Sequence, residues 1–153
     1  MNTVYKVVRK VGNRHYSLMM RLPQWKHQYI MGIINRPKFG ISKFFAFREL
    51  SDAKEMRSQF LILELPCEIL ICETPDTIPC ERVPYLNPTQ EIALAFWNGC
   101  RVLNTLELHN STVLCSWLKP IRVYQPQSPM KKKLVFKTQE PPQDTGNLTL
   151  DMI

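Results

Sequence analysis

The stretch "AFWNGCR" (95–101) brings together the residue types that recognise a nucleotide. Phe96 and Trp97 supply flat rings on which a nucleobase can stack, and Asn98 supplies an amide that can hydrogen-bond its edge. Arg101 follows at once, and a guanidinium forms paired hydrogen bonds with phosphate oxygens. The alternative is that both rings belong to the core and that Asn98 and the following glycine only end a helix.

A second cation lies in an apolar segment, "TVLCSWLKPIRVY" (112–124). Alternate side chains of a strand point to opposite faces, so Lys119 and Arg122 lie close to the core of the predicted sheet. Either both cations point to water or they are placed to meet an anion. We expect Arg122 to lie beside the 95–101 turn and to complete a cationic pocket there.

Other cations and one aromatic residue extend the set of candidates. Arg9 shares strand parity with Val7, which places it on the more apolar face of the first strand, where a cation needs an acid or a ligand phosphate. Lys43 and Arg48 flank "FFAF", and the alternative for both is a strand-end charge. The candidate ligand-binding residues are Arg9, Tyr16, Lys43, Arg48, Phe96, Trp97, Asn98, Arg101 and Arg122.

Motifs for catalysis and metal binding are missing from the sequence. It contains no glycine-rich phosphate loop, G-x-S-x-G, H-E-x-x-H or C-x-x-C. A dyad of His109 with Cys100 or Cys115 stays open, but nothing else places a nucleophile beside a base. The odd cysteine count and its spacing favour neither a disulfide framework nor zinc. We therefore expect no catalytic residue, no metal and no cofactor.

Charge is distributed unevenly along the chain. Residues 1–60 hold twelve Lys and Arg against three acids, which is +9, and residues 61–124 hold four against seven, which is −3. A basic surface built by the first half suits a nucleotide, a nucleic acid or an acidic protein. The sequence contains no run of ~18 uncharged apolar residues and no signal-peptide layout, so we expect a cytoplasmic protein without a membrane partner.

The pattern of residues predicts an α+β domain over 1–124. It has a mostly antiparallel sheet of about six strands with two short helices on one face, and its open edges favour a homo-oligomer. Residues 125–153, rich in Pro, Gln and Lys, are predicted to form a flexible tail or an extended arm. Strands are expected over 3–11, 15–21, 28–34, 42–50, 67–73, 112–117 and 119–124, with an irregular stretch over 74–85, and helices over 52–60, after Ser51, and 88–97, after Asn87.

Five segments carry a resemblance to a known family: "VYKVVRKVGNRHYSLM", "KFFAFRELSDA", "CEILICE", "FWNG" and "TVLCSWLKPIRV". In this order they resemble small phage proteins of the Thoeris anti-defence sponge type, which sequester cyclic ADP-ribose signals made by TIR-domain enzymes. The resemblance covers about 5–124, and the stretches around 65–67 and 75–87 and the tail depart from it. It implies an α+β domain, assembly into dimers to hexamers, and interface pockets that hold a cyclic nucleotide intact.

The resemblance also implies roles for individual residues. It places Arg101 and Arg122 on the diphosphate, Phe96 and Trp97 near the base, and Asn98 as a polar reader. The resemblance further implies that some members of the family hold cyclic oligonucleotides at a second site. The first functional hypothesis is therefore a non-catalytic phage counter-defence protein in the host cytoplasm that sequesters a cyclic nucleotide.

Two alternatives come from other functional classes. In the first, the chain is a small ADP-ribosyl-transferase-like enzyme, in which Arg9 and Tyr16 hold a dinucleotide and Glu73 or Glu107 is the catalytic acid. In the second, it is an inhibitor that binds a host protein or nucleic acid through its basic first half. Nucleic acid is the less favoured partner, because the aromatic residues lie inside apolar runs instead of alternating with Lys and Arg.

Overall fold

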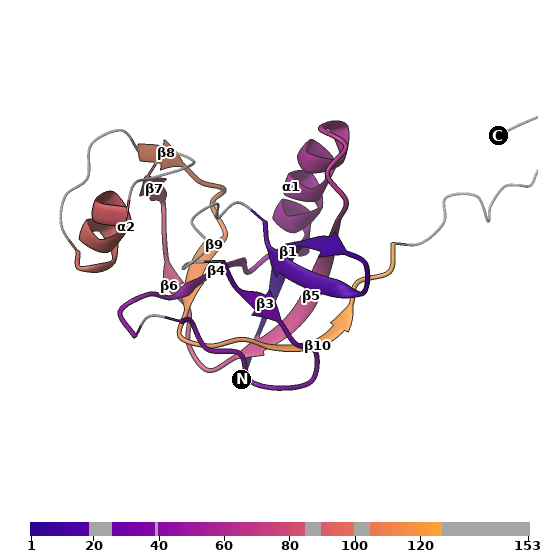
Figure 1. The fold of residues 1–153 in the computed structure, drawn as a ribbon, viewed down its shortest axis with the longest axis horizontal. Coiled ribbons are helices and arrows are strands. Elements are labelled where there is room, and N and C mark those ends of the chain that lie inside the picture. Colours follow the sequence, from indigo (N-terminus) through magenta and orange to yellow (C-terminus); the bar gives the residue numbers. More distant parts are fainter. Residues whose placement is uncertain (19–25, 39, 85–89, 100–104, 127–153) are drawn as a thin grey trace, which may run out of the picture.

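The structure, a computed structural model, describes residues 1–18, 26–38, 40–84, 90–99 and 105–126. These residues form an α+β fold of two helices and a curled antiparallel sheet (Figure 1), in agreement with the sequence prediction. Neither helix combines the length and apolar character needed to cross a membrane. The elements are β1 (Asn2–Val11), β2 (Arg14–Ser17), β3 (Gln28–Tyr29), β4 (Phe44–Phe47), α1 (Leu50–Ile62), β5 (Cys67–Thr74), β6 (Ile78–Pro79), β7 (Arg82–Pro84), α2 (Gln90–Trp97), β8 (Thr105–Glu107), β9 (Thr112–Cys115) and β10 (Lys119–Val123).

The sheet is built around the long β1–β5 pair. These strands are antiparallel from Asn2 opposite Thr74 to Arg9 opposite Cys67. The strand order is β10-β5-β1-β4-β9-β6, while β2 pairs with the far end of β1 and β3 pairs with β2. A separate pair, β7 and β8, lies beside α2 (Figure 1).

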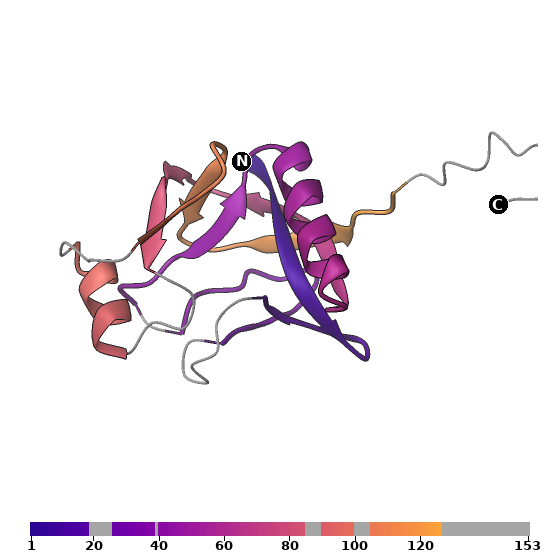
Figure 2. The ribbon, with the colours of Figure 1, turned by 90° about the horizontal axis from the view of Figure 1, so that it is seen from above.

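Both faces of β1 are buried at its middle, and each face belongs to a different core. The inner face, on the inside of the curl, carries Val4 and Val8, and its core joins side chains of strands that are not neighbours in the sheet. The outer face carries Val7, which packs with Ala53 of α1. Figure 2 shows α1 lying along β1 on this side. The inner core consists of Val4, Val8, Tyr29, Phe44, Ala46, Leu70, Cys72, Val113, Cys115 and Leu118.

The start of α1 differs from the prediction. The helix begins at Leu50 with Glu49 as its N-cap, so Ser51 lies inside the helix and does not cap it. Asp52 lies in the first turn, where a negative charge favours the helix dipole, and accepts two hydrogen bonds from Ser111: from Oγ at 2.6 Å and from N at 3.2 Å. The loop before β9 therefore provides the polar contact at this helix end.

Several strands also differ in length from the prediction. The third strand has only two residues, Gln28–Tyr29, because the buried Asn35 side chain bonds Ile30 N and O and draws the chain into turns. The stretch predicted to be irregular contains β6 and β7, which are two and three residues long. The predicted cap Asn87 and the tail from residue 127 lie outside the described residues.

Candidate functional site

The β1–β2 hairpin gathers three cations around one aromatic ring on its outer face. Arg9 lies directly opposite Tyr16 in the register, and Arg14 lies two residues before Tyr16 on the same face. The Nζ of Lys26 lies 5.0 Å from the centroid of the Tyr16 ring, a cation–π distance. All three cations are exposed and the ring is half-buried. We call Arg9, Arg14, Tyr16 and Lys26 the hairpin patch.

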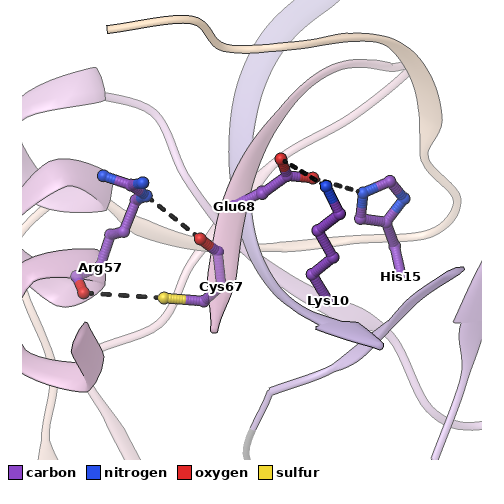
Figure 3. A network of polar contacts seen from close by, with 5 residues as sticks. All are labelled: Lys10, His15, Arg57, Cys67 and Glu68. Carbon is purple, nitrogen blue, oxygen red and sulfur yellow. Dashed lines mark hydrogen bonds and ion pairs between the residues drawn. The ribbon is translucent and has the colours of Figure 1, made fainter. Parts of the chain in front are cut away.

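The acid nearest to this hairpin in the register points to the opposite face. Glu68 pairs with Val8 of β1, and its carboxylate contacts His15 Nε2 at 2.7 Å and Lys10 Nζ at 3.5 Å on the inner face (Figure 3). Arg57 of α1 reaches β5 from the other side and donates to Cys67 O at 3.2 Å. Within the described ranges, no carboxylate lies within 4.0 Å of a cation of the hairpin patch. Within the described structure, no acid therefore competes with an external anion for these three cations.

The exposure of Arg9 corrects one prediction. Arg9 does share a face with Val7, but only Val7 is covered by α1. The strand continues past the helix into the hairpin, so that Val11, on the same face, is 51% exposed. Arg9 is consequently a surface cation and not a buried one that needs a partner.

A second polar group, Lys6, lies inside the curl, between Val4 and Val8 on the inner face of β1. Its Nζ donates a hydrogen bond to Phe45 O at 2.5 Å and lies 5.7 Å from the centroid of the Tyr29 ring. Burial lowers the pKa of the Lys6 amine to about 8, although the nearby Cys115 and Cys72 groups act to raise it. Sequence reasoning missed this residue.

His27 extends this inner group. The pKa of its imidazole is lowered, and burial is the largest of several causes. The ring is therefore neutral at pH 7. Asn35 Oδ1 accepts from Ile30 N, and His27 Nε2 lies 3.2 Å from the same oxygen, which makes Nε2 the donor and Nδ1 an acceptor. Nδ1 is buried and has no hydrogen-bond partner within the described chain. The ring lies 4.8 Å from Tyr29 and 4.9 Å from Phe44 between centroids.

The two aromatic residues of the 95–101 stretch pack on the sheet. Phe96 stacks on Phe45 at 6.2 Å and Trp97 lies 5.6 Å from Phe45, between ring centroids, on the outer face of β4. These rings dock α2, as the core alternative predicted, although each stays half-buried. Asn98 is exposed and follows the helix end, which Gly99 terminates with a φ of +79°. Arg101 lies outside the described residues.

Arg122 does not join this turn. It is exposed on β10, opposite Ile71, and the register shifts between Pro120 and Arg122. Ile121 and Arg122 are both exposed, so the alternation of faces is broken at this irregularity. In Figures 1 and 2, β10 and α2 lie at different sides of the molecule, because α2 packs on Phe45 of β4, and β5 and β1 lie between β4 and β10 in the sheet order. The predicted pocket between Arg122 and the 95–99 segment is therefore wrong.

Lys43 and Arg48 are separated as well. Lys43 Nζ lies 3.4 Å from Ser116 Oγ, and the same hydroxyl donates to Asp76 Oδ2 at 2.9 Å, which reduces the attraction of this site for an anion. Arg48 is exposed after β4, and its backbone N bonds Ser111 O.

Two pairs from the enzyme alternatives, Cys115 with His109 and Glu73 with Arg9, are also apart, while Cys100 lies outside the described residues. Cys115 lies in the inner core, where burial raises the pKa of its thiol, whereas His109 contacts Phe47 on the outer face. Glu73 lies six residues along β5 from Cys67, the partner of Arg9, which corresponds to about 20 Å. Within the described ranges, no three His, Cys, Asp or Glu residues gather to hold a metal ion.

Comparisons with known proteins give no match for this chain: no family model, no curated protein and no solved structure is similar to it at a significant level.

Proposed function

We propose that this protein binds a cyclic nucleotide, an isomer of cyclic ADP-ribose, at the hairpin patch and holds it without cleaving it. The observation that carries the proposal is that Arg9 and Arg14 share the outer face of the hairpin with Tyr16, that Lys26 lies over the Tyr16 ring, and that no acid lies within ion-pair distance of these cations in the described structure. A diphosphate needs cations and a base needs a flat ring, and this surface offers both. The choice of this nucleotide class rests on the resemblance to the Thoeris anti-defence sponge type.

The energetics favour a ligand that a second copy of the chain helps to enclose. Submicromolar retention needs a binding free energy beyond about −8 kcal/mol. Charge-assisted hydrogen bonds contribute about 1.5–3 kcal/mol each and base stacking about 1–3 kcal/mol, before the costs of association. Solvent and salt weaken such contacts on an open surface. A homo-oligomer, from dimer to hexamer, that closes over the hairpin patch would supply the remainder.

Two neighbouring residues of β1 provide a matched test. Arg9→Gln removes a charge from the hairpin patch, whereas Lys10→Gln removes the same charge from the opposite face of the strand. In calorimetric titrations with cyclic ADP-ribose isomers, we expect Arg9→Gln to weaken binding at least tenfold and Lys10→Gln to change it less than twofold. Equal losses in both variants would show that only net charge matters, and would overturn the assignment of the site.

A second candidate function follows from the exposure of the same cations. An open basic surface also suits a single-stranded nucleic acid or an acidic protein. Affinity for single strands would fall steeply with salt, and Arg9→Gln would reduce the magnitude of the salt slope by about one. A salt-dependent polyanion complex without any nucleotide binding would favour this candidate over the first.

A further inference from the structure

We propose that the loop after β3 and the adjoining part of β10 form a docking surface for an anionic lipid bilayer. Four exposed isoleucines define this surface, which we call the isoleucine patch: Ile30, Ile33, Ile34 and Ile121. The patch shares no residue with the hairpin patch. The contact is peripheral, so it departs from the expectation of no membrane partner, which rested on the absence of an apolar run long enough to span a bilayer.

A buried side chain holds the loop in shape. Asn35 is only 5% exposed, and its Nδ2 donates hydrogen bonds to Ile30 O at 2.9 Å and to Ile33 O at 3.0 Å. Its Oδ1 accepts a third hydrogen bond from Ile30 N at 2.9 Å. Gly32 makes the turn between these residues with a φ of +81°, which a glycine adopts without strain. The polar centre of the loop is therefore filled, and the isoleucines face outward.

Backbone hydrogen bonds attach this loop to β10. Gly32 N donates to Pro120 O at 2.7 Å, while Asn35 and Leu118 exchange both of their backbone hydrogen bonds, at 2.7 and 3.0 Å. These contacts hold the loop after β3 against β10 (Figure 1). Ile121 directly follows Pro120, so it lies beside the isoleucines of the loop.

The exposure of the isoleucine patch calls for a partner. Each of its four side chains is between 44% and 51% exposed. Single exposed apolar residues are ordinary on a protein surface, but a cluster on one anchored loop and the strand beside it marks an interaction site. Isoleucine is β-branched and has few rotamers, so it loses little side-chain entropy when a partner covers it.

The charges beside the patch select the class of partner. Arg36 follows the loop, Lys38 lies two residues further on, and Arg122 follows Ile121; all three cations are exposed. In the part of the chain that the structure describes, no carboxylate lies within 4.0 Å of any of them. The partner must therefore be both apolar and negatively charged. A bilayer with anionic headgroups above its acyl chains has both properties, and it attracts Lys and Arg side chains to its surface.

Other partners match this surface less well. A second copy of the chain, docked through the same patch, would bring Arg36 and Arg122 against the same cations, and like charges across an interface oppose binding. An amphipathic helix of another protein needs a groove to lie in. The isoleucines instead project from a tight turn and a strand beside it, and such a tip enters a fluid interface without a matching shape.

The test measures co-sedimentation of the full chain with vesicles of phosphatidylcholine, alone or with about 30% phosphatidylglycerol. We expect at least tenfold tighter binding to the anionic vesicles. Ile33→Gln and Ile121→Gln, on two different elements, should each weaken binding about fivefold. Ile62→Gln is the matched control, because Ile62 at the end of α1 is 80% exposed and lies outside the patch. This control should change binding less than twofold.

A second pair of variants separates this surface from the hairpin patch. Arg122→Gln should weaken binding to the anionic vesicles about fivefold, whereas Arg9→Gln should change it less than twofold. Three results would overturn the proposal: no binding of the wild-type chain to anionic vesicles, equal losses in Ile33→Gln and Ile62→Gln, or equal losses in Arg122→Gln and Arg9→Gln. The last of these would show that only the net charge of the chain attracts it to lipid.

Discussion

Replacing Lys6 by methionine should stabilise the protein at neutral pH, because the folded chain holds a charged amine in a buried place. The difference between the ordinary lysine pKa of 10.5 and the value of about 8 corresponds to about 3 kcal/mol of unfavourable free energy below pH 8. Methionine has a similar length and no charge, but it leaves Phe45 O without its donor, which costs about 1 kcal/mol. We therefore expect Lys6→Met to raise the unfolding free energy at pH 7 by about 2 kcal/mol.

The sign of the pH dependence follows from proton binding. Between pH 8 and 10.5 the unfolded chain binds the Lys6 proton and the folded chain does not, so the lysine form gains stability as pH rises. The buried thiol of Cys72, with its pKa raised to about 12, lowers the stability of both proteins above pH 9. The advantage of Lys6→Met should therefore shrink by about 3 kcal/mol between pH 7 and pH 10.5.

Urea denaturation of wild type and variant across this pH range measures the difference directly. Lys10→Met is the matched control, because Lys10 lies on the same strand and face. Unlike Lys6, its side chain is exposed, and its amine pairs with Glu68. Its difference from wild type should stay below about 1 kcal/mol throughout. A flat difference for Lys6→Met, or a loss of stability at pH 7, would show that the amine is not held charged in an apolar interior.

Three further changes test the architecture around the sites. Asn35→Ala should lower the unfolding free energy by about 3 kcal/mol, because the buried backbone groups of Ile30 and Ile33 lose their hydrogen-bond partner. Asn2→Ala, at an exposed position, should cost under about 0.5 kcal/mol. Similar losses for both variants in chemical denaturation would contradict the role of Asn35 in holding this loop. Asp52→Ala should cost about 1–2 kcal/mol by removing both hydrogen bonds from Ser111, and an unchanged midpoint would refute this contact. Gly12→Ala should cost about 1 kcal/mol because φ is +61° there, and a variant with an unchanged melting temperature would argue against that hairpin geometry.

The fold was largely predictable from local sequence signals. Gly12 set the hairpin, and Gly99 ended the second helix where the sequence indicated. The shortening of the third strand was not predictable, because it depends on the Asn35 side chain, which bonds Ile30 and is held by Leu118, a residue far away in the sequence. Short strands such as β6 lack the length that gives a recognisable alternation.

The candidate site was predictable only in part. The pairing of Arg9 with Tyr16 follows from the hairpin register, but the position of Lys26 over the ring depends on the path of a long connection. Lys6 went unnoticed because both faces of β1 are buried, so that alternation alone does not distinguish the interior from the surface. Arg122 was misplaced because the separation of β10 from α2 depends on the strand order, which the sequence does not show.

The proposed function is tested most directly by native mass spectrometry of the protein incubated with cyclic ADP-ribose isomers, followed by denaturation and recovery of the nucleotide. The proposal predicts an oligomer that carries the nucleotide at a fixed stoichiometry and returns it unaltered, with the complex lost in Arg9→Gln and kept in Lys10→Gln. A chain that binds none of these isomers, or that releases a cleaved product, would contradict it.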